Sequence, residues 1–203
     1  MMPKVVPEYK NMARHRILSA AQKLFAEDGF NKTSMDGIAK EVGVSKAALY
    51  LYFRSKEELL SEMYEASPST FSEILDSSFG ENRGKKDAEE FFEKMADQYA
   101  SNPTFSFEVF SEAAHNSKIR SAILQKYEGY DRIISEFLGK KTGGRIKEAY
   151  DTRAFSFALI ALWNGMETLL VAGITREEVK RAWITALIAI FSPIGRRVND
   201  AQL

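Results

Sequence analysis

Four residues, Val42–Ser45 (VGVS), separate two segments that each have the length of a short helix. The first segment, about residues 34–42, repeats its apolar residues at helical spacing. Ser45 is a favourable N-cap for the second segment, about residues 46–52, and Gly43 can adopt the positive φ of a tight turn. Two such helices joined by a short glycine-containing turn have helix-turn-helix geometry. The spacing therefore predicts a fold that includes a helix-turn-helix.

Helical periodicity also dominates the rest of the chain, whereas strand-like alternation and Asn-Gly hairpin signals are absent from the sequence. We expect helix breaks at SPSTF, residues 67–71, and at Pro193. The sequence predicts an all-α protein with a three-helix head, residues 1–65, and a larger helical body, residues 66–203. Predicted helices cover about 11–28, 34–42, 46–52, a stretch that begins after Ser55, 86–101, 103–114, 117–139, 146–172 and 176–192.

Charge is unevenly distributed although the net charge of the 203 residues is zero. Residues 1–60 hold ten Lys or Arg against seven Asp or Glu, a balance of +3, so the remainder carries −3. This asymmetry argues against a protein that coats nucleic acid along its whole surface. It is compatible with a local basic face at the N-terminal end.

The sequence lacks the residues and motifs that several functional classes require. There is no cysteine and only two histidines, and no H-E-x-x-H, P-loop or G-x-G-x-x-G motif. We therefore predict no catalytic residues, no metal site and no cofactor. Two alternatives stay open: a helical enzyme with a Ser-His-Asp site, and a helical adaptor whose helix-turn-helix is only a scaffold.

Neither the N-terminus nor any apolar run predicts a membrane segment. The opening residues, MMPKVVPEYK, lack the apolar stretch of a secretory signal. The longest strongly apolar run, Phe155–Trp163, is interrupted by Ser156, and a membrane span needs roughly 20 apolar residues. We expect a cytoplasmic protein without a membrane partner.

The second short helix has the features expected of a helix that enters a DNA groove. Lys46 and Tyr50 lie four residues apart and share one face, and the small side chain of Ala47 allows close approach. We expect Leu49 to point into the core of the head together with Phe53. Phosphate contacts are also expected from Thr33 and Ser34, at the start of the first short helix, and from Lys56, in the first turn of the helix that follows.

The stretch Thr33–Leu60, TSMDGIAKEVGVSKAALYLYFRSKEELL, closely resembles the helix-turn-helix signature of the TetR family of bacterial transcriptional regulators. Residues 16–30, RILSAAQKLFAEDGF, are similar to the first helix of that family, so the resemblance covers about residues 10–65. It implies a repressor that binds double-stranded operator DNA. The positions that it implies as DNA contacts are occupied by Ser45, Lys46, Ala47, Tyr50, Tyr52 and Lys56.

Two positions depart from common forms of this motif, and a third position, Tyr52, has two interpretations. Ala47 often appears as Gly or Pro in the family, and Leu51 is often aromatic or His. These departures bear on the operator sequence more than on DNA binding itself. Taken alone, Tyr52 is as consistent with core packing as with a phosphate contact. Residues 66–203 resemble the family only in being helical and in ending with two long apolar helices.

Aromatic residues are concentrated in the predicted body, where residues 91–163 contain 13 of the 24 in the chain. Sparse polar residues among them are typical of a ligand pocket, and a filled core without a cavity is the alternative. We expect a mostly apolar small-molecule effector that weakens DNA binding. Its candidate lining is Phe107, Phe110, Tyr127, Tyr130, Trp163 and Glu167.

The two C-terminal helices, about residues 146–172 and 176–192, are apolar around much of their circumference. We therefore expect them to form a homodimer interface, because interface cores favour aromatic over charged residues. Two-fold symmetry would then require a pseudo-palindromic operator.

Overall fold

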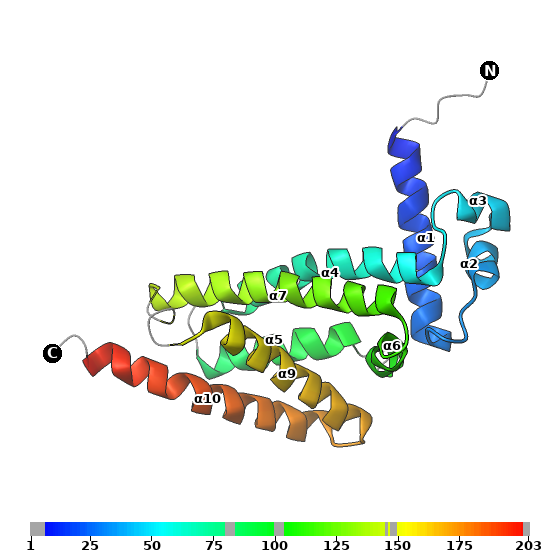
Figure 1. The fold of residues 1–203 in the computed structure, drawn as a ribbon. Helices are drawn as coiled ribbons and strands as arrows, with labels where there is room; N and C mark the ends of the chain where they lie inside the picture. The colour runs from blue at the N-terminus through cyan, green and yellow to red at the C-terminus, as the bar shows by residue number, and fades with distance from the viewer. Residues whose placement is uncertain (1–6, 80–83, 100–103, 145, 147–149, 201–203) are drawn as a thin grey trace. The chain divides into compact units, whose positions relative to one another are not determined.

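The computed structural model describes residues 7–79, 84–99, 104–144, 146 and 150–200, and within these ranges every regular element is a helix. The prediction of an all-α fold is confirmed. Figure 1 shows the helices α1 (Pro7–Asp28), α2 (Met35–Val42), α3 (Lys46–Tyr50), α4 (Lys56–Phe79), α5 (Lys85–Tyr99), α6 (Phe105–Ala113), α7 (Ser117–Thr142), α9 (Thr152–Val171) and α10 (Arg176–Asp200).

The described residues form two compact units. The first contains the residues up to Ala66 together with Thr104–Gln125, and the second contains those from Ser67 to the end of α5 and those from Lys126 onward. The boundary at Ala66 falls inside α4, so this helix contributes to both units. Residues 104–125, which the sequence analysis assigns to the body, therefore pack with the first unit.

Two contacts explain this placement of α6. The ring of Phe105 stacks on that of Phe25 in α1, with centroids 6.0 Å apart. The carboxylate of Glu108 accepts a hydrogen bond of 3.3 Å from the backbone N–H of Asn31, in the turn between α1 and α2. Neither contact has a local signal in the sequence, because the partners lie about 80 residues apart.

Apolar residues from α1 to α4 make the core of the first unit. Each helix presents one buried face, as the helical spacing of these residues predicts. Leu49 and Phe53 are both fully buried, so the expectation that they lie in this core is confirmed. Phe30, in the turn between α1 and α2, belongs to the same core, and the other core residues of these helices include Ile17, Ala21, Phe25, Ile38, Leu59 and Leu60.

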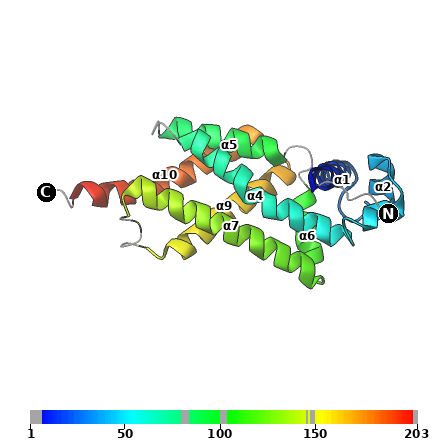
Figure 2. The same cartoon turned by 90° about the horizontal axis from the view of Figure 1, so that it is seen from above.

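An aromatic-rich core holds the second unit together. In this unit α10 packs against α5 and α9, which Figures 1 and 2 show from two directions. Trp163 of α9 and Trp183 of α10 meet edge to face, with ring centroids 5.4 Å apart. Further members of this core include Phe71, Leu75, Phe91, Phe92, Met95, Tyr130, Ile134, Leu138, Met166 and Leu187.

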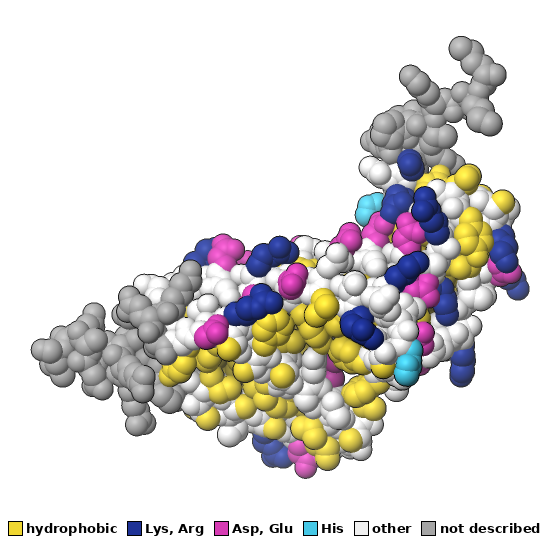
Figure 3. All heavy atoms as spheres, in the orientation of Figure 1, with side chains coloured by type: hydrophobic (Ala, Val, Ile, Leu, Met, Phe, Trp, Pro, Cys, Tyr) yellow, Lys and Arg dark blue, Asp and Glu magenta, His cyan; other side chains and the backbone are white. Residues whose placement is uncertain are grey.

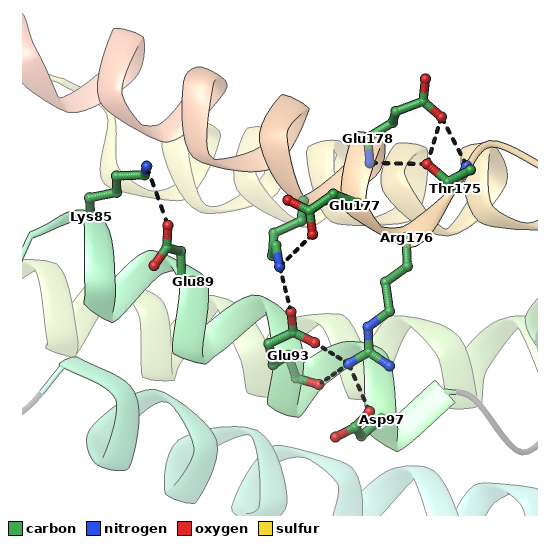
Figure 4. A network of polar contacts seen from close by, with 9 residues as sticks. Lys85, Glu89, Glu93, Asp97, Thr175, Arg176, Glu177 and Glu178 are labelled. Carbon is green, nitrogen blue, oxygen red and sulfur yellow. Dashed lines mark hydrogen bonds and ion pairs between the residues drawn. The ribbon is translucent and has the colours of Figure 1, made fainter.

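An ionic network also links α10 to α5, as Figure 4 shows. Arg176 pairs with Glu93 and, at 2.7 Å, with Asp97. Lys180, one turn further along α10, pairs with Glu93 at 3.1 Å. At the start of α10, Thr175 and Glu178 form a capping box: the Glu178 carboxylate accepts from the backbone N–H of Thr175, and the Thr175 hydroxyl accepts from the backbone N–H of Glu178.

The expected helix break at SPSTF is wrong, because α4 continues through Pro68. Tertiary packing accommodates this proline: Gly129 of α7 lies against it, and a Cβ at Gly129 would come within 2.5 Å of Pro68 Cγ. The expected stop at Pro193 is also wrong, because α10 extends to Asp200.

The start of α9 is another correction to the predicted helices. This helix begins at Thr152 rather than near 146, because the Asp151 side chain caps it by accepting hydrogen bonds from the N–H groups of Arg153 and Ala154. The predicted helix start lies partly outside the described residues, which omit 145 and 147–149.

Among the described residues, α9 is the one helix long and apolar enough to match the length and composition of a membrane span. The core helix of a soluble protein passes the same test. Here Ile160, Trp163 and Met166 belong to the core of the second unit, and the ionisable Glu167 is buried beside them. One face of α9 is therefore buried in this core, although only 28% of its most apolar stretch is buried within the chain.

Candidate nucleic-acid interface

Caps and a left-handed glycine define the two helices α2 and α3. Ser34 and Ser45 accept hydrogen bonds from the N–H groups of Gly37 and Ala48, so each serine caps one helix. Gly43 ends α2 with φ of 79°, and its N–H and that of Val44 both bond to the carbonyl of Ala39. This conformation favours glycine and turns the chain sharply into α3.

The side chains of α3 divide into a buried and an exposed face. Leu49 anchors the helix in the core, whereas Lys46, Ala47 and Tyr50 are exposed. Leu51, directly after α3, is 82% exposed and is the most exposed large apolar residue that the structure describes. An exposed face that combines a lysine, a tyrosine and small or apolar side chains fits the edges and methyl groups of a DNA major groove.

Lys46 is held by an acidic neighbour. Its ammonium group lies 2.7 Å from the Asp36 carboxylate of α2. The hydrogen bond that Lys46 donates to the Asp36 carboxylate, together with the negative charge of that carboxylate, raises the pKa of Lys46. Both side chains are more than half exposed, so water screens the pair and a DNA phosphate can compete for the lysine.

Tyr52 lies at the edge of this surface and is half-buried. Its backbone carbonyl accepts a hydrogen bond of 3.1 Å from Arg14 of α1. The Arg14 guanidinium also covers the Phe53 ring at 4.4 Å and pairs with Glu62 of α4. Arg14 therefore holds the chain between α3 and α4 in place. This role could not be predicted from the sequence, because an arginine that bonds to a distant carbonyl and one that is only solvated look the same on the polar face of a helix.

Thr33 is buried, so it is not the exposed contact residue that we expected, whereas Ser34 is exposed. Thr33 is only 4% exposed, and its hydroxyl donates to the carbonyls of Gly29 at 2.7 Å and Leu24 at 3.2 Å. Its hydroxyl therefore stabilises the turn before α2 rather than facing a ligand. The physical reason is that the end of α1 leaves carbonyl groups that need donors.

Lys56 has partners on the same turn. Its ammonium group donates to the carbonyl oxygen of Phe30 at 2.7 Å and lies 3.3 Å from that of Asn31. The expected position at the first turn of α4 is correct, and the side chain is half-buried. An ammonium has three donors, so these bonds leave it able to face a phosphate as well.

The six candidate ligand-lining residues do not all come together within one unit. Phe107 and Phe110 are partly exposed on α6 in the first unit. In the second unit, Trp163 donates from Nε1 to the buried Glu167 carboxylate at 2.7 Å. The other two, Tyr127 and Tyr130, lie on α7 with ring centroids 6.4 Å apart.

The structure has the geometry of a helix-turn-helix protein. Two short helices are joined by a turn at a glycine, and the second helix has one exposed face and one face packed on a helical core. Residues 17–63 match the family model described as "Bacterial regulatory proteins, tetR family". The helix-turn-helix region of this chain therefore matches the TetR family model, and the resemblance found in the sequence is confirmed for this region.

Three similar proteins extend the comparison beyond this region. The fatty acid metabolism regulator protein of Bacillus subtilis (strain 168) is 25% identical over 185 residues, which cover 78% of this chain and 94% of that protein. A TetR-family transcriptional regulator from Rhodococcus sp. has a similar fold, with a TM-score of 0.72 at 17% identity over 87% of this chain and 97% of the other. FadR from Thermus thermophilus, solved with lauroyl-CoA, has a TM-score of 0.62 at 20% identity over 86% and 93% of the two chains.

Proposed function

We propose that this chain is a cytoplasmic, ligand-responsive transcriptional regulator that binds a specific DNA operator. The observation that carries the proposal is the exposed face of α3, formed by Lys46, Ala47 and Tyr50 on a buried Leu49 anchor. The family of the helix-turn-helix region supports it. The same family favours a repressor over an activator.

The proposed DNA contacts are Ser34, Ser45, Lys46, Ala47, Tyr50, Tyr52 and Lys56, with Thr33 supporting the turn from inside. Bound sequences recovered from a random duplex pool would test the proposal directly. We expect one enriched sequence, and Lys46→Ala should bind it more weakly. Lys140→Ala is the matched control, because Lys140 is also an exposed, ion-paired lysine but lies on α7. Equal binding of all duplexes, or none, would favour the alternative of a helical enzyme or adaptor.

We also propose a homodimer formed through α9 and α10. Large apolar side chains remain exposed on and between these helices, namely Leu169, Val171, Ile174 and Ile188. Figure 3 shows hydrophobic side chains gathered on the face that carries α9 and α10. Burying such a surface against a second copy is favourable, and two-fold symmetry then calls for a pseudo-palindromic operator.

Sedimentation at micromolar concentration tests the dimer. Ile188, which is 52% exposed, offers the sharpest variant: Ile188→Glu should give a monomer. Leu124→Glu is the control, because Leu124 is 55% exposed on α7, outside the proposed interface. A wild-type monomer, or equal dissociation in both variants, would contradict the proposed interface.

The proposed effector is a mostly apolar small molecule that releases the operator. The aromatic core of the second unit supports this choice, and the lauroyl-CoA bound by the similar Thermus thermophilus protein is a largely apolar molecule at its acyl end. Because α4 contributes to both units, a ligand that moves its second half can act on its first. Coupling must be reciprocal, so operator DNA should weaken effector binding by the same factor. Titrating an effector into a preformed operator complex measures this factor, and unchanged operator affinity at saturation would refute the regulation.

A further inference from the structure

Two arginines of α1 donate hydrogen bonds to backbone carbonyls on either side of α3. Arg16 Nη2 lies 3.3 Å from the carbonyl oxygen of Val42, the last residue of α2. Arg14 Nη1 lies 3.1 Å from the carbonyl oxygen of Tyr52, two residues beyond the end of α3. The last carbonyls of a helix have no partner within it, and an arginine can bond to them. The helix α1 therefore holds the backbone both before and after α3.

Packing by itself fixes the orientation of α3 only in part. The helix has five residues, of which Leu49 is the buried one, and Phe53 is buried just after it. Two buried side chains set how deep the helix lies, whereas its exposed face can still turn about the line that joins them. Base edges are read by groups that the surrounding residues hold closely in place. The two arginine bonds supply the further fixed points that this requires.

Arg14 makes three contacts that a lysine cannot make together. Besides the Tyr52 carbonyl, its guanidinium contacts the Glu62 carboxylate of α4 and the Phe53 ring, whose centre lies 4.4 Å away. A guanidinium is planar and carries five donors in a fixed fork, whereas an ammonium is a compact charge on a flexible chain. The Arg14 side chain is 30% exposed and its charge is paired, so its contacts orient the protein rather than a phosphate.

Arg16 acts at the turn between α2 and α3 and is the more exposed of the two arginines. Its acceptor, the Val42 carbonyl, comes directly before Gly43, whose left-handed conformation turns the chain into α3. A guanidinium bonded there limits how far this turn can open. Water competes for an exposed bond of this length, so we expect a smaller effect from Arg16 than from Arg14.

We infer that Arg14 and Arg16 are positioning residues, which set the orientation of α3 in the DNA groove and thereby the discrimination between DNA sequences. This inference rests on the proposed DNA-binding function and names the residues outside the helix-turn-helix that give it selectivity. Non-specific binding depends mainly on phosphate charge and does not require one orientation of α3. Loss of either arginine fork should therefore weaken binding to the operator and leave binding to other duplexes unchanged.

Charge-conserving variants of the full-length protein separate orientation from electrostatics. Arg14→Lys and Arg16→Lys keep each positive charge and remove the planar fork. Their affinities are measured at several salt concentrations for the enriched operator and for a shuffled duplex of the same length and composition. We expect operator affinity to fall about tenfold in Arg14→Lys, which is the discrimination that one good base contact supplies, and about threefold in Arg16→Lys. Affinity for the shuffled duplex should stay within about twofold of the wild type, and the salt slope should not change.

Arg120→Lys is the matched control for a merely structural role. Arg120 also donates to two carbonyls at a helix end, those of Ala113 at 3.1 Å and Ala114 at 2.9 Å, and it belongs to the same compact unit. These carbonyls end α6 and do not flank α3. We expect Arg120→Lys to lower the melting temperature, as Arg14→Lys should, but to leave discrimination between the two duplexes unchanged.

The outcomes separate this inference from the proposed function. Wild-type discrimination that both Arg14→Lys and Arg16→Lys retain would overturn the positioning role and leave the regulator in place. An equal loss of affinity for both duplexes, or the same loss of discrimination in Arg120→Lys, would also overturn it, since either result indicates a general defect. A wild type that binds both duplexes equally would refute the proposed function and this inference with it. If Arg14→Lys does not fold, the exposed Arg16→Lys decides against the same control.

Discussion

The ammonium nitrogen of Lys56, the first residue of α4, lies 2.7 Å from the carbonyl oxygen of Phe30 and donates a hydrogen bond to it. The same nitrogen lies 4.7 Å above the centre of the Phe30 ring. On the other side of this turn, Glu108 accepts the N–H of Asn31. The turn between α1 and α2 is thus held by a cation from α4 and a carboxylate from α6.

Replacing Lys56 should therefore affect folding as well as DNA binding. We expect Lys56→Met to lower the free energy of unfolding by about 1–2 kcal/mol, because two backbone carbonyls lose a charged donor. Operator affinity should fall and its salt dependence should flatten by about one unit in log–log slope. Chemical denaturation and binding at several salt concentrations measure the two effects. An unchanged unfolding free energy would contradict the structural role.

Lys46 and Asp36 should act oppositely on DNA binding. Lys46→Ala removes one phosphate partner, so affinity should fall for all sequences and the salt slope should decrease by about one. Asp36→Asn removes the carboxylate that pairs with Lys46 and repels phosphate, so affinity should rise, most strongly at low salt. Both residues are exposed, and neither change should shift the melting temperature noticeably. An affinity that falls in Asp36→Asn would show that this carboxylate positions Lys46.

The contact between Pro68 and Gly129 predicts strong non-additivity. Gly129→Ala should destabilise the fold by about 1–3 kcal/mol, because the new methyl group meets the proline ring. With Pro68→Ala in place, the same change should cost little or even stabilise α7, since alanine favours helix. A double-mutant cycle by urea denaturation measures the coupling. Equal costs in both backgrounds would show that the backbone moves to relieve the clash.

The lowered pKa of Lys126 predicts a pH-dependent stability. Its pKa is about 8 in the folded chain and about 10.4 when unfolded, so between these values the unfolded state binds more protons. The cost of burying the charge is complete below pH 8 and is relieved as pH rises through 8 toward 10.4. We expect the wild type to gain about 1–2 kcal/mol relative to Lys126→Met between about pH 7.5 and 9.5. Parallel curves for the two proteins would contradict this prediction.

The sequence predicted α2 and α3 almost to the residue because their ends depend on local chemistry. Ser34, Gly43 and Ser45 act on backbone groups within four residues of themselves. Such interactions can be recognised without knowing the tertiary structure. The same reasoning placed Leu49 in the core, since helical spacing alone separates it from Lys46 and Tyr50.

Expectations that depended on distant contacts were less accurate. A proline usually ends a helix, but Pro68 does not, because α4 packs along α7 at Gly129. Thr33 has the same hydroxyl whether it faces DNA or, as here, the carbonyls at the end of α1. Phe107 shares its aromatic character with Tyr127, yet only the second belongs to the unit that contains Trp163.

The stacking of Phe105 on Phe25 limits which segments of this protein can be joined to segments of its relatives in a chimera. A chimera that joined residues 1–65 to a foreign effector domain would leave Phe25 without that ring and the turn at Asn31 without Glu108. It would also sever α4 one residue before the boundary between the two units. A DNA-reading module transplanted from this chain must therefore carry residues 104–125 with it, or find an equivalent helix in its new host.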